Sequence, residues 1–287
     1  MDQSTNILGL PQDSEREIHP TAIVEPGARI AGGVRIGPWC HVGPEVVIER
    51  GTRLTSHVVV DGRTRIGADC VIYPFVSIGL PPQDLKYKGE PTLCEIGDRT
   101  QIREHVTIHR GTVTGSGITR VGSDCLLMAV AHVAHDCDIG DGVIVVNNVV
   151  MGGHVTIGDN AVIGGSAALH QFVRIGRGAM IGGVSGVEAD VIPFGLVIGN
   201  RARLIGLNLV GLKRRGVDRA GQHRLRAAYR ALFGAGTAQP VFADRLAAVR
   251  ASHGADPFVA EVLAFLEMPS RRGLIRAGRR HDGADQE

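Results

Sequence analysis

The chain has 287 residues and a formal net charge of +2, long enough for one large domain with a smaller one beside it. Forty glycines, with few aromatic residues and abundant Val, Ile and Leu, favour short strands and tight turns over a helix bundle. Residues 1–20 lack the apolar segment of a signal peptide, and no apolar run approaches the roughly 18 residues that span a bilayer. We therefore expect a cytoplasmic protein without a transmembrane segment.

A six-residue repeat of aliphatic residues runs through most of the chain. It occupies every sixth position from Ile18 to Ile78, resumes in phase from Ile96 to Ile108, and continues one residue out of phase from Val121 to Val187. Only Met151 in this series is not Val, Ile or Leu. A period of six fits neither an α-helix nor an alternating strand, and hexapeptide repeats build a parallel β-helix of triangular coils. We assign residues 18–200 to this β-helix, preceded by an N-terminal extension, residues 1–17.

Glycine and cysteine recur at fixed positions relative to the repeated aliphatic residue. Glycine often comes directly after the repeated aliphatic residue, as in Ile36-Gly37 and Ile157-Gly158, where we expect a turn that needs permissive backbone. The cysteines share the phase of the small inward position of the repeat and form no Cys-x-x-Cys motif. They are Cys40, Cys70, Cys94, Cys125 and Cys137. This pattern indicates buried free cysteines rather than metal ligands or disulfides.

Two segments interrupt the repeat and are expected to leave the β-helix as loops. Residues 79–95 contain prolines and charges that a ladder strand excludes, and Asp84 and Lys86 near the middle could contact an anionic substrate. Mere surface decoration is the alternative for this loop. Residues 111–120 are rich in Gly, Thr and Ser and are expected to form a shorter excursion.

The repeat is expected to end at Val187, because Pro193 occupies the next position of the series. Residues 201–276 are then predicted to form an α-helical domain that covers the open strand edges, followed by a polar tail, residues 277–287. Apolar spacing and end signals predict helices over residues 218–233, 240–252 and 256–267.

The C-terminal part is basic, with 16 Lys and Arg against 8 Asp and Glu from residue 201 onward. Such a balance suggests an acidic partner or a phosphate-bearing ligand, although a solvated helix surface gives the same pattern.

The segment Ala131–Cys137 (AHVAHDC) places two histidines and a carboxylate inside the aliphatic repeat. Because residues 18 apart are neighbours on stacked coils, Gly153 lies one coil above His135, and His170 lies about one coil above His154. One cluster near a single edge of the prism can therefore contain His132, His135, Asp136, His154 and His170.

Three interpretations fit this cluster. His135 could be a general base oriented by Asp136 or a neighbouring carbonyl, taking a proton from a sugar hydroxyl that attacks an acyl thioester. The Gly153 N–H would then stabilise the oxyanion. Alternatively, three histidines could bind zinc and activate water, as in β-helical carbonic anhydrases. In the third, the histidines only satisfy backbone groups of turns, which suits a single histidine better than four histidines and an aspartate on stacked coils.

Several segments together resemble the UDP-N-acetylglucosamine O-acyltransferase family. They are Val106–Thr112 (VTIHRGT), Ala131–Cys137, His170–Phe172, Gly211–Gly216 (GLKRRG), Gln83–Tyr87 (QDLKY) and Arg272–Arg276 (RGLIR), spread over nearly the whole chain. The resemblance implies a left-handed parallel β-helix and a homotrimer with active sites in clefts between subunits. It also implies transfer of an (R)-3-hydroxyacyl chain from acyl carrier protein to the 3-hydroxyl of UDP-N-acetylglucosamine, the first step of lipid A biosynthesis.

The same resemblance assigns roles to individual residues. His135 would be the catalytic base, Asp136 its orienting residue, and the Gly153 amide the oxyanion donor. The substrate-binding residues that it implies are Asp84, Lys86, His132, His154, His170, Gln171, Asn208, Arg214 and Arg215. It implies no cofactor, no metal and no nucleic-acid partner.

The chain departs from the family pattern in the region of the acyl groove and the nucleotide. Gly183 matches the position that leaves the acyl groove open and suggests a long chain, whereas Arg201 stands where a histidine often closes the groove. Val210 stands where an acidic residue often contacts the ribose.

Other functions remain open at this stage. The same fold could acylate a 3-amino UDP-sugar, and the related N-acyltransferase of the pathway would normally carry an additional N-terminal domain. Interpretations from other classes are a zinc-dependent hydro-lyase of the carbonic anhydrase type and a non-catalytic scaffold.

Overall fold

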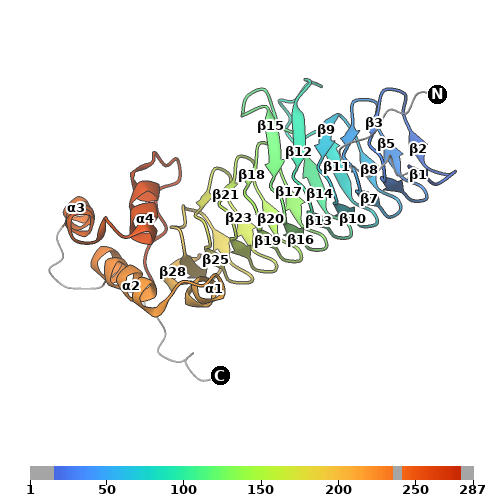
Figure 1. Ribbon diagram of the computed structural model, residues 1–287. Helices are drawn as coiled ribbons and strands as arrows, with labels where there is room; N and C mark the ends of the chain where they lie inside the picture. The colour runs from blue at the N-terminus through green and yellow to red at the C-terminus, as the bar shows by residue number, and fades with distance from the viewer. Residues whose placement is uncertain (1–15, 235–240, 279–287) are drawn as a thin grey trace, which may run out of the picture.

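The computed structural model describes residues 16–234 and 241–278, and it consists of a long parallel β-helix with four helices gathered at one end (Figure 1). Most of the predicted N-terminal extension, most of the predicted polar tail and the predicted helix start at Pro240 lie outside the described residues. Within those ranges, no helix is long and apolar enough to cross a membrane.

Three sheets form the faces of the β-helix, and successive short strands along the chain belong to successive sheets. The first face, sheet A, contains β1 (Glu17–Ile18), β4 (Arg35–Ile36), β7 (Arg53–Leu54), β10 (Val71–Ile72), β13 (Gln101–Ile102), β16 (Leu126–Leu127), β19 (Ile144–Val145), β22 (Val162–Ile163), β25 (Met180–Ile181), β27 (Gly195–Ile198) and β28 (Arg203–Leu207). The second face, sheet B, contains β2 (Ile23–Val24), β5 (His41–Val42), β8 (Val59–Val60), β11 (Ser77–Leu80), β14 (Thr107–His109), β17 (His132–Val133), β20 (Val150–Met151), β23 (Ala168–Leu169) and β26 (Gly186–Val187). The third face, sheet C, contains β3 (Arg29–Ile30), β6 (Val47–Ile48), β9 (Arg63–Ile66), β12 (Leu93–Ile96), β15 (Ile118–Val121), β18 (Asp138–Ile139), β21 (Thr156–Ile157) and β24 (Arg174–Ile175).

The hexad repeat determines this architecture. In a two-residue strand one side chain faces out and the next faces in, and parallel pairing places Leu127 in register with Ile102 below and Val145 above. Every aliphatic residue of the series from Ile30 to Val187 is buried. Ile18 is 41% exposed, because β1 has a neighbouring strand on one side only. The predicted fold, a left-handed parallel β-helix with C-terminal helices, is confirmed.

The glycines that follow the repeated aliphatic residues have a different role from the predicted one. The left-handed backbone conformation occurs two residues later, for example at Trp39 (φ 61°) after Gly37 and at His154 (φ 62°) after Gly152. A Cβ on Gly37 would lie 1.7 Å from the carbonyl oxygen of Thr55 in the next coil. Gly37 is therefore required by the close approach of stacked backbones, not by its own dihedral angles.

The cysteines are free and buried, as the repeat phase predicts. They are Cys40, Cys70, Cys94, Cys125 and Cys137. Burial raises the pKa of the Cys94 and Cys137 thiols to about 12, so these side chains stay protonated and act as small apolar fillers.

The chain leaves the coils twice, between β11 and β12 and between β14 and β15. The second excursion is the shorter, because Ile118–Val121 is already a strand paired with β12 and β18. Both excursions lie on the same side of the prism as sheet C (Figure 1).

The β-helix continues beyond Val187, where the six-residue series was predicted to end. After Val187 the buried positions step by four residues to Val191 and then by six to Val197, which places Pro193 in a corner turn and extends sheet A by β27 and β28. The last of these strands runs antiparallel to its neighbour.

Four helices cover this end. They are α1 (Leu209–Arg214), α2 (Arg219–Phe233), α3 (Phe242–His253) and α4 (Pro257–Glu267). Asp218 caps α2 and Asp256 caps α4 by accepting backbone N–H groups of the first turn. Leu225 and Val259 pack beside Ile192 and Leu207 of the last coil, which removes its apolar end from water.

The buried aliphatic ladder predicts a large stability difference between inward and outward positions. Ile72→Ala should lower the free energy of unfolding by about 2–5 kcal/mol, since Ile72 is fully buried and its loss leaves a cavity. Ile23→Ala, at a position 58% exposed in the first coil, should cost less than about 1 kcal/mol. Denaturant unfolding of both variants checks this, and equal losses would contradict the assigned phase of the repeat.

Candidate active site

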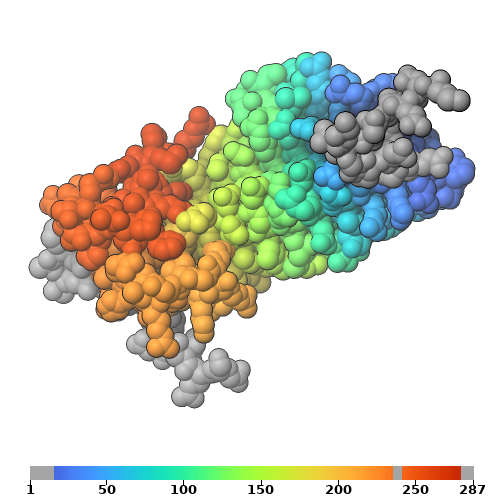
Figure 2. Space-filling view, viewed as in Figure 1, coloured from blue at the N-terminus to red at the C-terminus, as the bar shows by residue number. Residues whose placement is uncertain are grey.

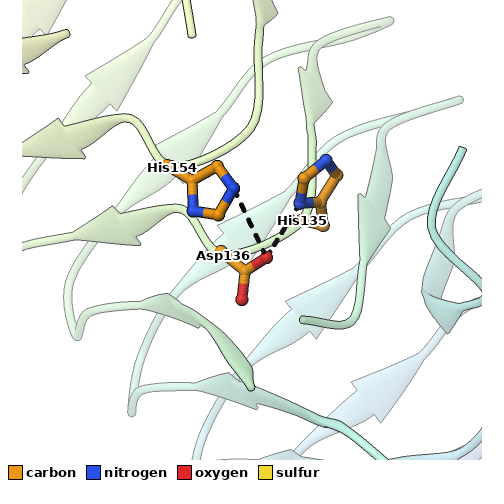
Figure 3. Close-up of side chains that lie close together, drawn as sticks. All are labelled: His135, Asp136 and His154. Carbon is orange, nitrogen blue, oxygen red and sulfur yellow. Dashed lines mark hydrogen bonds and ion pairs between the residues drawn. The ribbon is translucent and has the colours of Figure 1, made fainter. Parts of the chain in front are cut away.

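The predicted catalytic residues meet at the corner where sheet B passes into sheet C. His135 and Asp136 connect β17 to β18, and His154 occupies the equivalent corner one coil above, between β20 and β21. His135 Nδ1 lies 2.8 Å from Asp136 Oδ2, and His154 Nε2 lies 3.9 Å from the same oxygen (Figure 3). The His135 and His154 rings meet edge to face, with centroids 5.1 Å apart.

Asp136 is held by the short excursion that precedes β15. Its fully buried carboxylate accepts hydrogen bonds from the Thr112 N–H at 3.1 Å, the Thr112 hydroxyl at 2.6 Å, the Ser116 hydroxyl at 3.1 Å and the Gly117 N–H at 3.1 Å. Burial raises the pKa of this carboxyl, but the hydrogen bonds from His135 and Thr112 lower it more, so the pKa lies well below the usual range. Asp136 is therefore ionised at neutral pH.

The charge on Asp136 fixes the state of His135. An ionised carboxylate only accepts hydrogen bonds, so His135 Nδ1 carries a proton and Nε2 is the ring nitrogen left to act as the base. The His135 side chain is 12% exposed, which keeps the ring in one orientation while leaving an edge accessible.

This supporting loop was not identified as functional from the sequence. Only glycine fits at position 115 of this loop, because a Cβ there would lie 2.4 Å from the Asp136 carboxylate. The sequence does contain a positional signal for this loop. Ile118 lies 18 residues before Asp136 and therefore one coil below it, and the Gly, Thr and Ser residues of the excursion directly precede Ile118.

Gly153 lies against the ring of His135. A Cβ at this position would be 2.5 Å from His135 Cε1 and 2.7 Å from Nε2, so only glycine fits. The N–H of Gly153 makes no hydrogen bond to any residue that the structure describes, whereas the neighbouring Gly152 and His154 amides bond to adjacent coils. A backbone donor is thus available beside the imidazole.

His132 belongs to the same region but points out from β17. Its Nδ1 lies 2.7 Å from the Thr107 hydroxyl, and its ring meets the buried His109 ring edge to face at 5.1 Å. Burial lowers the pKa of His109 to about 4, with further lowering from His132 and His135. Burial likewise lowers the pKa of His132 and of His154, so these rings are neutral at pH 7.

The loop between β11 and β12 and the coil above contribute residues at the margin of the cluster. The charge of Asp84 raises the pKa of His154, which places this loop residue within electrostatic range of the site. Lys86 is exposed. His170 is exposed and bonds through Nδ1 to the Gln171 carbonyl at 3.2 Å, and among the described residues it makes no ring contact with the other histidines.

The residues that match nucleotide-binding positions lie at a different corner. The Asn208 side chain caps α1 and donates to the Gly178 carbonyl at 3.0 Å, and Arg215 donates to the Asn160 carbonyl. Gly178 and Asn160 follow sheet C strands, so they occupy the corner between sheets C and A. Arg214 is exposed.

The groove residues lie at the third corner. Gly183 follows β25 on the way from sheet A to sheet B, and both Gly183 and Arg201 are exposed. A single copy of the chain therefore does not bring the predicted base, nucleotide and acyl-groove residues into one site.

A cavity of about 410 Å³ opens beside the catalytic corner on the sheet C side. Its wall includes Asp136, His154 and Phe172, with Ser116 of the supporting loop on one side and Arg271 of the C-terminal segment on the other. Figure 2 shows the surface hollowed between this loop, coloured green, and the red C-terminal part. Phe172 and Arg271 are site residues that the sequence did not indicate.

His135, Asp136 and His154 could in principle hold a metal ion, since one ligand atom from each lies within 4.8 Å of the others. Both Asp136 oxygens already accept hydrogen bonds from the supporting loop, and Oδ2 also bonds to His135. An ion between these groups would have to replace the His135–Asp136 hydrogen bond. The donor set suits an oriented general base better than a zinc centre.

Two family models match the chain. Residues 190–275 match the second domain of UDP-N-acetylglucosamine O-acyltransferase, and residues 118–153 match the bacterial transferase hexapeptide repeat. The acyl-[acyl-carrier-protein]–UDP-N-acetylglucosamine O-acyltransferase of Azorhizobium caulinodans is 53% identical over 263 residues, which cover 91% of this chain and 96% of the relative.

Solved structures agree with this relationship. The UDP-N-acetylglucosamine O-acyltransferase of Moraxella catarrhalis is 43% identical with a TM-score of 0.83, covering 90% of this chain and 99% of that one. The UDP-N-acetylglucosamine acyltransferase of Francisella novicida is 33% identical with a TM-score of 0.87, covering 94% and 99%. With near-complete coverage of relatives at these identities, the chain belongs to the UDP-N-acetylglucosamine O-acyltransferase family.

Proposed function

We propose that the chain transfers an (R)-3-hydroxyacyl group from acyl carrier protein to the 3-hydroxyl of UDP-N-acetylglucosamine, the first step of lipid A biosynthesis. The observation that carries this proposal is the oriented His135–Asp136 pair with the unbonded Gly153 N–H beside it, in a chain whose relatives are named for this reaction. The proposal includes a cytoplasmic homotrimer that uses no metal or cofactor.

In the proposed mechanism His135 transfers a proton twice. His135 Nε2 accepts the proton of the sugar hydroxyl as its oxygen forms a bond to the thioester carbonyl carbon. The Gly153 N–H donates to the oxygen that becomes negative in the tetrahedral intermediate. When the carbon–sulfur bond breaks, His135 returns the proton to the thiolate of the carrier. Asp136 stabilises the imidazolium between these steps and keeps the ring in the required tautomer.

The distribution of the predicted residues over three corners supports the proposed homotrimer. We infer that the cleft between two copies combines His135 of one with Arg214 and Arg215 of the other, because these residues lie on different corners of one chain. Arginine suits the diphosphate of the nucleotide sugar by its bidentate geometry. The basic C-terminal part, which is next to the site, suits an acidic carrier protein.

Two alternatives remain worth testing against this proposal. A 3-amino UDP-sugar would use the same base and oxyanion donor, and the result would be an amide. The zinc hydro-lyase is the other, because three potential ligand atoms lie close together.

A transfer assay on metal-depleted protein tests the proposed function. It offers UDP-N-acetylglucosamine or its 3-amino analogue together with 3-hydroxyacyl carrier proteins of several chain lengths. We expect turnover without metal, preference for the hydroxyl acceptor, and selection of a long acyl chain because Gly183 leaves the groove open. Turnover that appears only when zinc is restored would contradict the proposal.

The matched variants in this assay are His135→Ala and His19→Ala. Loss of the base should lower kcat by roughly 10²–10⁴-fold, whereas His19 is exposed near the far end and should have no effect. A kcat within twofold of wild type for His135→Ala would remove the assigned mechanism.

Mixed trimers test whether the site is shared. Arg214→Ala should mainly raise the KM for UDP-N-acetylglucosamine, because the arginine contacts the nucleotide and not the reacting atoms. Co-expression of His135→Ala with Arg214→Ala chains should restore activity at low nucleotide-sugar concentration, since some clefts then receive both intact residues. Activity no higher than that of the two variants assayed separately would place both residues in one chain's site.

A further inference from the structure

The segment after α4 returns to the β-helix and is fixed there on both sides. Asp190 bonds through its backbone to Gly273 and Ile275, and Leu204 bonds likewise to Arg276 and Gly278. The Ser270 hydroxyl accepts the N–H groups of Arg272 at 3.2 Å and Gly273 at 2.8 Å, which closes a turn. Arg271 lies within this turn, so its backbone position is set by the fold.

The side chain of Arg271 reaches the cavity beside the catalytic corner. Its Cζ lies 4.7 Å from the centroid of the Phe172 ring, and the same ring stacks on His154 at 4.5 Å with an angle of 12°. Arg271 lines the cavity of about 410 Å³ together with Asp136 and His154. A guanidinium packed on an aromatic ring keeps its edge N–H groups free to bind in a defined plane.

The guanidinium of Arg271 lies over the Phe172 ring and has no carboxylate partner among the described residues. Arg120, the other arginine of the cavity, bonds to Glu95 at 3.2 Å and is in register with Asp138 on the next strand. Arg271 makes no ion pair with any carboxylate in residues 16–234 or 241–278. The Phe172 ring between them links Arg271 to His154 of the catalytic corner.

We propose that Arg271 is a substrate-positioning residue that binds a phosphate group of a substrate in the cavity beside the catalytic corner. This inference rests on the proposed function, whose two substrates both carry phosphate: the diphosphate of the nucleotide sugar and the phosphodiester of the carrier's phosphopantetheine arm. The Thr114 and Thr156 side chains line the same cavity and offer hydroxyl donors next to the guanidinium. Arg271 would hold the substrate and take no part in proton transfer.

Arg271→Met tests this role, because methionine retains an apolar stem against Phe172 and removes the charge. We expect the KM of one substrate to rise about tenfold or more while kcat stays within twofold, since a charge-assisted contact to a bound phosphate is lost. Arg271→Lys should fall between wild type and Arg271→Met, because it keeps the charge but loses the planar fork. Arg53→Met removes an equal charge from an exposed position on β7 and should change neither KM.

The two sources of phosphate are separated by the donor used. With an acyl-pantetheine that lacks the phosphate, Arg271→Met and wild type should become equal if the arm is the ligand, and should still differ in the KM for UDP-N-acetylglucosamine if the diphosphate is. Unchanged KM values for both substrates in Arg271→Met would overturn the proposal.

A structural role for Arg271 would give a different pattern. Because Arg271→Met keeps an apolar stem against Phe172, a purely structural role predicts unchanged KM values for both substrates. A wild-type protein that binds UDP-N-acetylglucosamine in calorimetry but transfers no acyl group would refute the proposed function. The role of Arg271 would then be decided by comparing the affinities of wild type and Arg271→Met for each substrate. Equal affinity of wild type and variant for both UDP-N-acetylglucosamine and carrier protein would then reject it.

Discussion

The buried carboxylate of Asp136 is the constraint on which the catalytic corner depends. A charged group without solvent would cost several kcal/mol unless hydrogen bonds replaced its hydration. The excursion before β15 provides these bonds from Thr112, Ser116 and Gly117, and His135 provides the remaining one. The loop therefore replaces solvent as the source of hydrogen bonds to the carboxylate.

Stacking of equal coils explains how distant residues gather at one edge. His135 and Gly153 are one coil apart, so the amide that can stabilise an oxyanion is brought to the ring that removes the proton. The same regularity separates other residues, because Gly183 and Arg215 follow strands of different sheets and reach different corners. We propose a trimer because two such prisms meeting along their edges would bring these separated residues into one cleft.

The fold could be predicted because its determinants are local and periodic. The hexad aliphatic residues, the small inward cysteines and the capping aspartates Asp218 and Asp256 are each visible in a few neighbouring residues. The cluster around His135 could be predicted for the same reason, since a spacing of one coil converts sequence distance into proximity. His170 shows the limit of that conversion, because it shares the edge but faces solvent.

Features that depend on contacts between separate segments could not be predicted in this way. The role of Gly37 depends on the backbone of the next coil, and the role of Thr112 depends on a loop that folds back on Asp136. Arg271 reaches the cavity only because the chain returns from α4 to the last coil. The shift of phase after Val187 likewise could not be predicted, because it depends on Pro193 fitting into a corner turn of the last coil.

The claim that Asp136, held by its loop, controls His135 is tested most directly by the pH profile of kcat in Thr112→Val. The substitution keeps the shape and removes the 2.6 Å hydroxyl bond to the carboxylate. Because that bond lowers the pKa of Asp136, its loss should make the carboxylate more basic. A more basic carboxylate should hold the proton of the His135 imidazolium more tightly, which should lower kcat roughly tenfold and move the acidic limb to higher pH. Thr55→Val, which removes a hydroxyl bond to the Ile72 carbonyl far from the site, should leave the profile unchanged. A Thr112→Val enzyme with the kcat and acidic limb of wild type would contradict the account.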